Sequence, residues 1–119
     1  MPKKILIVDD SMFMRKILKD ILSDKYQIVE AESGSTAKKM IKEEKPDLIL
    51  LDVIMPEGEE EGISVLKNTI KTMPKAKIIM VTAVGQDSII EECKKSGAVD
   101  YIIKPFDREK VVNTVEKHV

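Results

Sequence analysis

Five short apolar runs alternate along the chain with five segments of helical periodicity, and this alternation narrows the possible folds more than any other feature. The runs are rich in β-branched residues, and most lack the polar–apolar alternation of half-exposed strands. This pattern is typical of strands that are covered on both faces of a parallel sheet. The predicted strands are Ile5–Val8, Gln27–Ala31, Leu48–Leu51, Ile78–Val81 and Tyr101–Ile103.

Between these runs, apolar residues recur at intervals of three and four, as on one face of a helix. The stripes are Met14, Ile17, Leu18, Ile21 and Leu22; Ala37, Met40 and Ile41; Ile63, Leu66, Ile70 and Met73; Ile89, Ile90 and Cys93; and Val111, Val112 and Val115. Ser11 and Asp107 are predicted N-caps, and Gly97 is predicted to end the fourth helix. Short connections and right-handed crossovers then favour an α/β fold, a doubly wound five-stranded parallel sheet with five helices.

The composition argues against several classes of function. The 20 basic and 21 acidic residues leave no basic excess for nucleic acid or an anionic membrane, and aromatic residues make up only 3% of the chain. No apolar run is long enough to span a membrane. The 119 residues suit a single domain, and the one cysteine, Cys93, suits a reducing compartment, so a cytoplasmic location is expected.

Chemically reactive side chains follow four of the five predicted strands. Asp9 and Asp10 end the first strand, Asp52 the third, Thr82 the fourth and Lys104 the fifth. In a doubly wound sheet the functional site lies beyond the carboxyl ends of the strands, so these residues are expected to converge. Each alone has an ordinary explanation, such as a helix N-cap, a turn residue or a solvated lysine, but their joint placement favours a site.

The residue types indicate phosphoryl chemistry at this edge of the sheet. Three carboxylates in one pocket repel one another, and a hard cation such as Mg²⁺ relieves that repulsion while using only one or two of them as ligands. A remaining carboxylate beside a metal and an ammonium group can attack phosphorus and form an acyl phosphate. Lys104 and Thr82 are then placed to bind the phosphoryl oxygens.

Four motifs at these positions resemble the receiver domain of two-component response regulators, and the resemblance extends over the whole chain. They are "ILIVDDS", "DLILLDVIMP", "KIIMVTA" and "GAVDYIIKPF". The resemblance implies a flavodoxin-like, CheY-like sheet of strand order 2-1-3-4-5. It also implies that Asp52 accepts a phosphoryl group from a sensor histidine kinase, and that Asp9, Asp10, Asp52 and the backbone carbonyl of Ile54 hold Mg²⁺, with Mn²⁺ as an alternative.

The resemblance further implies a conformational switch. Lys104 pairs with the phosphoryl oxygens, Thr82 turns toward one of them, and Tyr101 rotates inward, which changes the face of the fourth helix, fifth strand and fifth helix. Residues expected on that face are Lys94, Lys95, Tyr101, Lys110 and Thr114. The Lys104–Pro105 peptide bond is expected to be cis. Such a protein is not an enzyme beyond assisting its own phosphorylation and slow dephosphorylation.

Two further stretches, "DDSMFMRK" and "TAVGQDSII", resemble stand-alone chemotaxis receivers of the CheY-like type. The implied protein is a monomeric receiver spanning residues 1–119, without an effector domain. Its implied partners are a CheA-like sensor histidine kinase, a motor switch protein or an adaptor to it, and a phosphatase, with no nucleic acid or membrane.

A receiver in a phosphorelay unrelated to chemotaxis is the alternative function. An aspartyl-phosphate phosphatase is disfavoured because Ile54 replaces its second aspartate, and a flavin module because Asp9–Asp10 would repel its phosphate.

The chain departs from the family pattern in two places. The family's glycine lies eight residues after the phosphoacceptor, whereas Gly62 lies ten after Asp52, so Gly58–Glu61 forms part of an acidic insertion. That insertion is either a solvated loop or a surface for one partner. Ile54 and Val84 are apolar at positions that help to set the acyl-phosphate lifetime, which predicts slow self-dephosphorylation and faster decay in an Ile54→Asn, Val84→Glu variant.

Several residues outside the motifs are expected to have structural roles only. His118 is expected to face solvent, and Cys93 to be a small buried hydrophobic residue. The methionines are expected to fill gaps in the core; they are Met12, Met14, Met40, Met55, Met73 and Met80.

Overall fold

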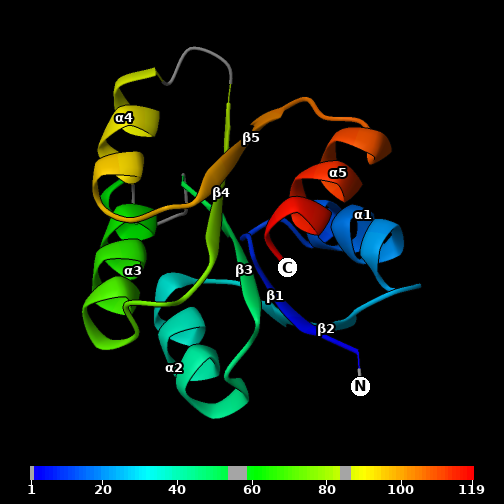
Figure 1. The fold of residues 1–119 in the computed structure, drawn as a ribbon, viewed down its shortest axis with the longest axis horizontal. Coiled ribbons are helices and arrows are strands. Elements are labelled where there is room, and N and C mark those ends of the chain that lie inside the picture. Colours follow the sequence, from blue (N-terminus) through cyan, green and yellow to red (C-terminus); the bar gives the residue numbers. More distant parts are fainter. Residues whose placement is uncertain (1, 54–58, 84–86) are drawn as a thin grey trace.

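The computed structural model describes residues 2–53, 59–83 and 87–119, with the backbone only at 59–61. Strands and helices alternate strictly, which confirms the predicted α/β class (Figure 1). The elements are β1 (Lys4–Val8), α1 (Met12–Leu22), β2 (Gln27–Ala31), α2 (Gly34–Glu44), β3 (Leu48–Asp52), α3 (Glu59–Thr72), β4 (Ile78–Ala83), α4 (Asp87–Lys95), β5 (Asp100–Lys104) and α5 (Arg108–His118).

All five strands are parallel and lie in the order β2-β1-β3-β4-β5, as the family resemblance implied. Figure 1 shows α2, α3 and α4 on one side of the sheet and α1 and α5 on the other. The order reverses direction beside β1, which places the carboxyl ends of β1 and β3 next to each other at the switch point of the sheet.

Residues along each central strand alternate between two hydrophobic cores. Leu51 and Met80 belong to the core beneath α2, α3 and α4, whereas Leu50 and Val81 belong to the core beneath α1 and α5. Both sets are at most 2% exposed, so the continuous apolar runs of the sequence correspond to strands buried on both faces. Successive side chains of a strand point to opposite faces, so residues two apart share a face. This alternation, called parity below, tells which face of the sheet each functional residue belongs to.

The predicted helix ends are confirmed. Ser11 Oγ accepts a hydrogen bond of 3.2 Å from the Met14 N–H, and Asp107 Oδ1 accepts one of 2.8 Å from the Lys110 N–H. At the end of α4, Gly97 has a φ of +112°, a left-handed conformation that favours glycine. Its N–H donates to the Lys94 carbonyl at 3.2 Å.

β1 begins one residue before its predicted start, at Lys4, and three strands extend beyond the carboxyl ends of their predicted apolar runs. β3 includes Asp52, β4 includes Thr82 and Ala83, and β5 runs from Asp100 to Lys104. The ladders continue through these polar residues, since Asp52 pairs with Val81. The reactive side chains therefore stand on the ends of rigid strands. The Lys104–Pro105 peptide bond is cis, as expected.

Three side-chain expectations are wrong. Met12 is 75% exposed because it starts α1 beyond the edge of the core, whereas Met14, Met40, Met73 and Met80 pack as predicted. His118 does not simply face solvent, since its Nε2 lies 2.9 Å from Asp100 Oδ2. Thr114 is 5% exposed and donates its hydroxyl to the Lys110 carbonyl at 2.7 Å, so it presents little surface.

Some predictions fall outside the described residues. These are the metal-binding carbonyl of Ile54, the packing of Met55, the residue Gly58, the side chains of Glu59, Glu60 and Glu61, and the position of Val84. Within the described part of the chain, no helix is long and apolar enough to cross a membrane.

Candidate functional site

The predicted site residues Asp9, Asp52 and Lys104 meet at the carboxyl edge of the sheet. Lys104 Nζ lies 3.6 Å from Asp9 Oδ2 and 3.5 Å from Asp52 Oδ1. Asp9 and Asp52 are only 2% and 4% exposed, so water screens this charge cluster weakly. All three residues share the parity of the core beneath α1 and α5, which explains why three different strands bring them together.

Asp9 is held firmly but is not fully satisfied. Its Oδ1 accepts a hydrogen bond of 2.9 Å from the Ser11 N–H. Its Oδ2 is buried and, among the described residues, has no hydrogen-bond partner. Leaving a buried charged oxygen without a hydrogen bond is costly, and Lys104 at 3.6 Å supplies only an ionic contact. This oxygen is therefore available to a ligand.

Asp10 completes an acidic cluster. Ligand oxygens of Asp9, Asp10 and Asp52 all lie within 4.8 Å of one another, and Asp10 is exposed. Two unit charges at that separation repel by about 3 kcal/mol at an effective dielectric of about 20. A hard divalent cation bound by carboxylate oxygens removes this repulsion, so the donor set fits Mg²⁺ chemically.

Thr82 and Tyr101 lie toward the opposite face of the sheet. Thr82 pairs with Ile103, and Tyr101 is two residues earlier on β5, so both have the parity of the core beneath α3 and α4. Thr82 is 1% exposed, and its Oγ1 has no hydrogen-bond partner among the described residues. The Lys94 ammonium lies 4.7 Å from the centre of the Tyr101 ring, a cation–π contact between α4 and β5.

Two residues near the site were not predicted from the sequence. Arg15 Nη1 donates to the Asp9 carbonyl at 2.6 Å. Gly62 of α3 approaches the backbone so closely that a Cβ would lie 2.7 Å from the Asp52 carbonyl oxygen. The family spacing drew attention to Gly62 only as a displaced glycine. Arg15 could have been noticed because it lies one turn into α1, four residues after the Ser11 cap.

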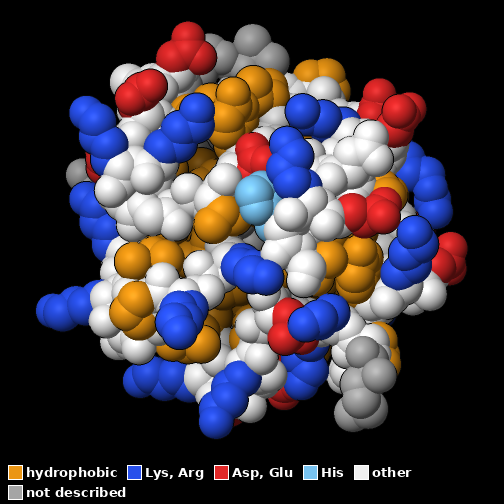
Figure 2. All heavy atoms as spheres, in the orientation of Figure 1, with side chains coloured by type: hydrophobic (Ala, Val, Ile, Leu, Met, Phe, Trp, Pro, Cys, Tyr) orange, Lys and Arg blue, Asp and Glu red, His pale blue; other side chains and the backbone are white. Residues whose placement is uncertain are grey.

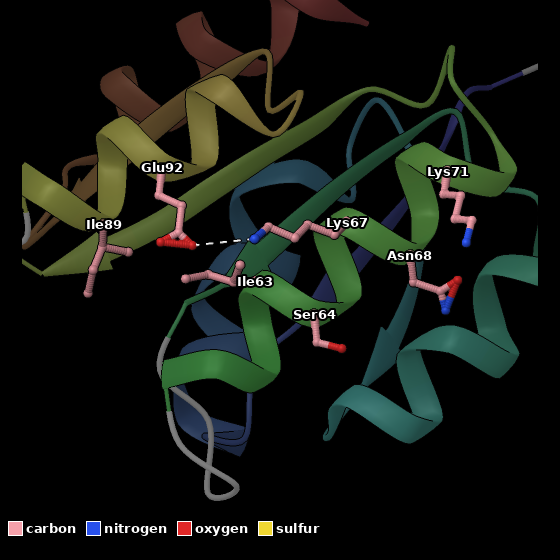
Figure 3. A pocket seen from close by; sticks show the side chains of 7 residues that line it. All are labelled: Ile63, Ser64, Lys67, Asn68, Lys71, Ile89 and Glu92. Carbon is pink, nitrogen blue, oxygen red and sulfur yellow. Dashed lines mark ion pairs between the residues drawn. The ribbon is translucent and has the colours of Figure 1, made fainter.

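A second surface feature is a groove between α3 and α4, shown in Figure 3. Lys67 and Glu92 form an ion pair of 3.6 Å across it, and Ile63 and Ile89 supply apolar walls. None of the described site residues lines it. On the face seen in Figure 2, Lys and Arg side chains are spread between patches of hydrophobic side chains and a smaller number of acidic ones.

Residues 5–116 match the family model of the response regulator receiver domain. The chain belongs to this family. The receiver is 44% identical over 119 residues to the chemotaxis protein CheY of Thermotoga maritima, with 98% of each chain covered. It is 43% identical over 116 residues to CheY of Listeria monocytogenes, with 96% of each covered.

Solved structures agree with this assignment. The receiver resembles Vibrio cholerae CheY4 with a TM-score of 0.91 at 27% identity, and the match covers 100% of both chains. The protein is therefore a CheY-like receiver, a phosphorylation-activated switch of the two-component type, and the similarity supports a role in chemotaxis. Receivers of this kind are signalling proteins rather than enzymes in the ordinary sense.

Proposed function

We propose that this receiver accepts a phosphoryl group on Asp52 and signals through the face formed by α4, β5 and α5. One observation carries the proposal. Two buried polar atoms, Asp9 Oδ2 and Thr82 Oγ1, have no hydrogen-bond partner among the described residues. Asp9 directly follows β1 and Thr82 belongs to β4, the two strands on either side of β3, which ends in Asp52. A metal-bound phosphoryl group would give both atoms a partner.

In the proposed reaction, an oxygen of Asp52 attacks the phosphorus of a phosphohistidine. The new O–P bond forms as the P–N bond breaks, and the imidazole leaves as the nitrogen base. Lys104 Nζ, already 3.5 Å from Asp52 Oδ1, then pairs with a phosphoryl oxygen. Mg²⁺, held by Asp9, Asp10, Asp52 and the Ile54 carbonyl, would neutralise charge on the transferred group, and Mn²⁺ would serve the same chemistry.

The proposed switch starts at Thr82. Its hydroxyl donates to a phosphoryl oxygen, and Tyr101, two residues from the β5 partner of Thr82 on the same sheet face, then moves inward. Moving Tyr101 changes its contact with Lys94 and so alters the surface between α4 and β5. Phosphorylation thereby changes the shape of a surface that a partner protein can recognise.

The partners in this proposal are a CheA-like sensor histidine kinase as phosphoryl donor and a motor switch protein or its adaptor as target. A phosphatase is a further partner. The sequence identity of 43% and 44% to two chemotaxis CheY proteins supports this choice over a phosphorelay unrelated to chemotaxis. The proposal also places the receiver in the cytoplasm as a monomer.

The test is incubation with acetyl phosphate and Mg²⁺, followed by intact-mass measurement. The parent protein should gain one phosphoryl group, and Asp52→Asn should gain none. Asp24→Asn is the matched control, because Asp24 is an exposed aspartate in the segment between α1 and β2. No gain in the parent, or a gain that survives in Asp52→Asn, would contradict the proposal.

A further inference from the structure

Arg15 connects three elements around the acidic pair. Its Nη1 donates to the Asp9 carbonyl at 2.6 Å, and its Nε donates to Glu30 Oε1 at 3.0 Å. Arg15 belongs to α1, Asp9 follows β1, and Glu30 belongs to β2. The Arg15 side chain is only 12% exposed, so it forms part of the packed structure beneath the site rather than a solvated charge.

The contact with the carbonyl fixes the backbone that carries the acidic pair. The Asp9 carbonyl and the Asp10 N–H belong to one planar peptide group, so the direction of the carbonyl sets that of the whole plane. The Asp9 N–H donates to the Ala31 carbonyl at 3.1 Å, which anchors the other side of Asp9. Asp10 is exposed and packing does little to hold it, so its position depends on this peptide plane.

Glu30 makes this arrangement compatible with a cation site. An unpaired guanidinium beside the pocket would repel a divalent cation, but the Arg15–Glu30 pair adds no net charge. Glu30 also fixes the guanidinium plane. Lys19 Nζ lies 3.8 Å from Glu30 Oε2, and because the Lys19 side chain is 51% exposed, solvent and salt screen its positive charge. The pair thus contributes geometry to the acidic pocket without weakening its negative potential.

We propose that Arg15 is a positioning residue for the magnesium site, oriented by Glu30, and that the pair sets the affinity for Mg²⁺ by fixing the Asp9–Asp10 peptide. The inference rests on the proposed function only in taking Asp9 and Asp10 as metal ligands. Lysine cannot replace Arg15, because one ammonium group does not reproduce the two directed contacts of the guanidinium fork.

The test is an NMR titration of the full chain with Mg²⁺ in the absence of any phosphoryl donor. Arg15→Lys, which keeps the charge, should weaken Mg²⁺ binding about tenfold. Arg15→Met should also weaken binding, although it removes a positive charge. Lys16→Met removes the same charge from the neighbouring, exposed position and should leave the affinity unchanged or slightly higher.

A second pair of variants removes charge equally but differs in hydrogen bonding. Glu30→Gln keeps an acceptor for Arg15 Nε and should bind Mg²⁺ more tightly than Glu30→Met. At saturating Mg²⁺, the rate of Asp52 phosphorylation in Arg15→Lys should approach that of the parent. If Arg15→Met fails to fold, Arg15→Lys and the two Glu30 variants decide the question.

Parental affinity in Arg15→Lys, equal affinities in the two Glu30 variants, or a loss in Lys16→Met as large as in Arg15→Met would overturn the inference. So would a parent protein that binds no Mg²⁺. A parent that binds Mg²⁺ but gains no phosphoryl group on Asp52 would overturn the proposed function alone, because the titration uses no phosphoryl donor.

Discussion

Asp9 and Asp10 are neighbours in the sequence but have different environments in the structure. Asp9 is 2% exposed and bound by the Ser11 N–H, whereas Asp10 is exposed. Asp9 is therefore a fixed part of the pocket, and Asp10 adds a charge that the fold without metal does not need. This difference makes Asp10 the better position for separating metal binding from folding.

Asp10→Ala is expected to raise the free energy of unfolding without metal by about 1 kcal/mol, because it relieves part of the repulsion among three close carboxylates. It should also abolish the stabilisation that Mg²⁺ gives the parent. Urea unfolding with and without Mg²⁺ measures both effects, with Asp24→Ala as the exposed control. An Asp10→Ala protein less stable than the metal-free parent would contradict the first expectation.

At the residue scale, the sequence predicts those site residues whose position follows from the ends of strands. Asp52 and Lys104 meet because parallel strands end at one edge. The Arg15–Glu30 and His118–Asp100 contacts were missed because they join side chains 15 and 18 residues apart whose pairing depends on how the elements pack. Local periodicity carries no information on such contacts.

At the scale of elements, Gly62 controls how closely α3 approaches β3. A Cβ at this position would lie 2.6 Å from the Val53 carbonyl oxygen and 2.7 Å from that of Asp52. Backbone atoms cannot move aside as a flexible side chain can. A glycine is therefore required here even though glycine disfavours a helix.

Gly62→Ala is expected to lower the free energy of unfolding. The gain in helix propensity is about 1 kcal/mol, but forcing backbones apart costs about 1–3 kcal/mol, so the clash prevails. Urea unfolding measures the change, and Asn68→Ala at an exposed position of α3 is the control for propensity alone. A Gly62→Ala protein as stable as the parent would show that α3 can shift without cost.

The end of α5 is joined to the start of β5 by His118 and Asp100. Burial alone would raise the pKa of Asp100, but hydrogen bonds from His118 and from the Tyr101 N–H outweigh it, so this pKa lies below its usual value. A lowered carboxyl pKa stabilises the fold above the unfolded-state pKa, and the stabilisation is lost as pH falls below about 4.

Asp100→Asn should therefore be less stable than the parent at neutral pH, and the difference should shrink as pH falls below about 4. Urea unfolding over a pH series measures it. In a His118→Ala background the pH-dependent part should be smaller, because one of the two stabilising hydrogen bonds is absent. A difference that stays constant through the acid range would contradict this assignment.

The order and type of the elements were predictable because continuous apolar runs and helical patterns barely overlap in this sequence. Ser11, Asp107 and Gly97 marked helix ends through local hydrogen bonds that depend on only a few residues. Strand ends were less predictable. Polar residues such as Asp52 and Lys104 continue the ladder for reasons of register, which an apolar run does not reveal.

At the scale of the whole molecule, the proposed mechanism links the acidic pocket to the α4–β5–α5 face through Thr82. Thr82→Ala should still be phosphorylated on Asp52, but the NMR signals of Tyr101 should no longer respond to phosphorylation. Intact mass measures the first effect, and spectra with and without acetyl phosphate measure the second. Tyr101 signals that move as far in Thr82→Ala as in the parent would show that another path carries the change.

The sequence predicted this coupling only through the family resemblance. The structure shows where its residues lie: register places Thr82 and Tyr101 on the face beneath α3 and α4, while Asp9, Asp52 and Lys104 lie toward α1 and α5. The shared face of residues on neighbouring strands can be assigned once the pairing of those strands is known. A single sequence does not determine that pairing.

The separation of the acidic pocket from the exposed helix surface has an evolutionary consequence. In the proposed mechanism the pocket lies at the carboxyl ends of the strands, whereas the partner surface includes exposed side chains of α4 and α5. Those exposed side chains can therefore change without altering Asp9, Asp52 or Lys104. A duplicated copy of this gene could acquire a new partner protein through substitutions at the exposed residues of α4 and α5 alone. The ancestral and the new copy would then accept phosphoryl groups from the same kinase and bind different target proteins.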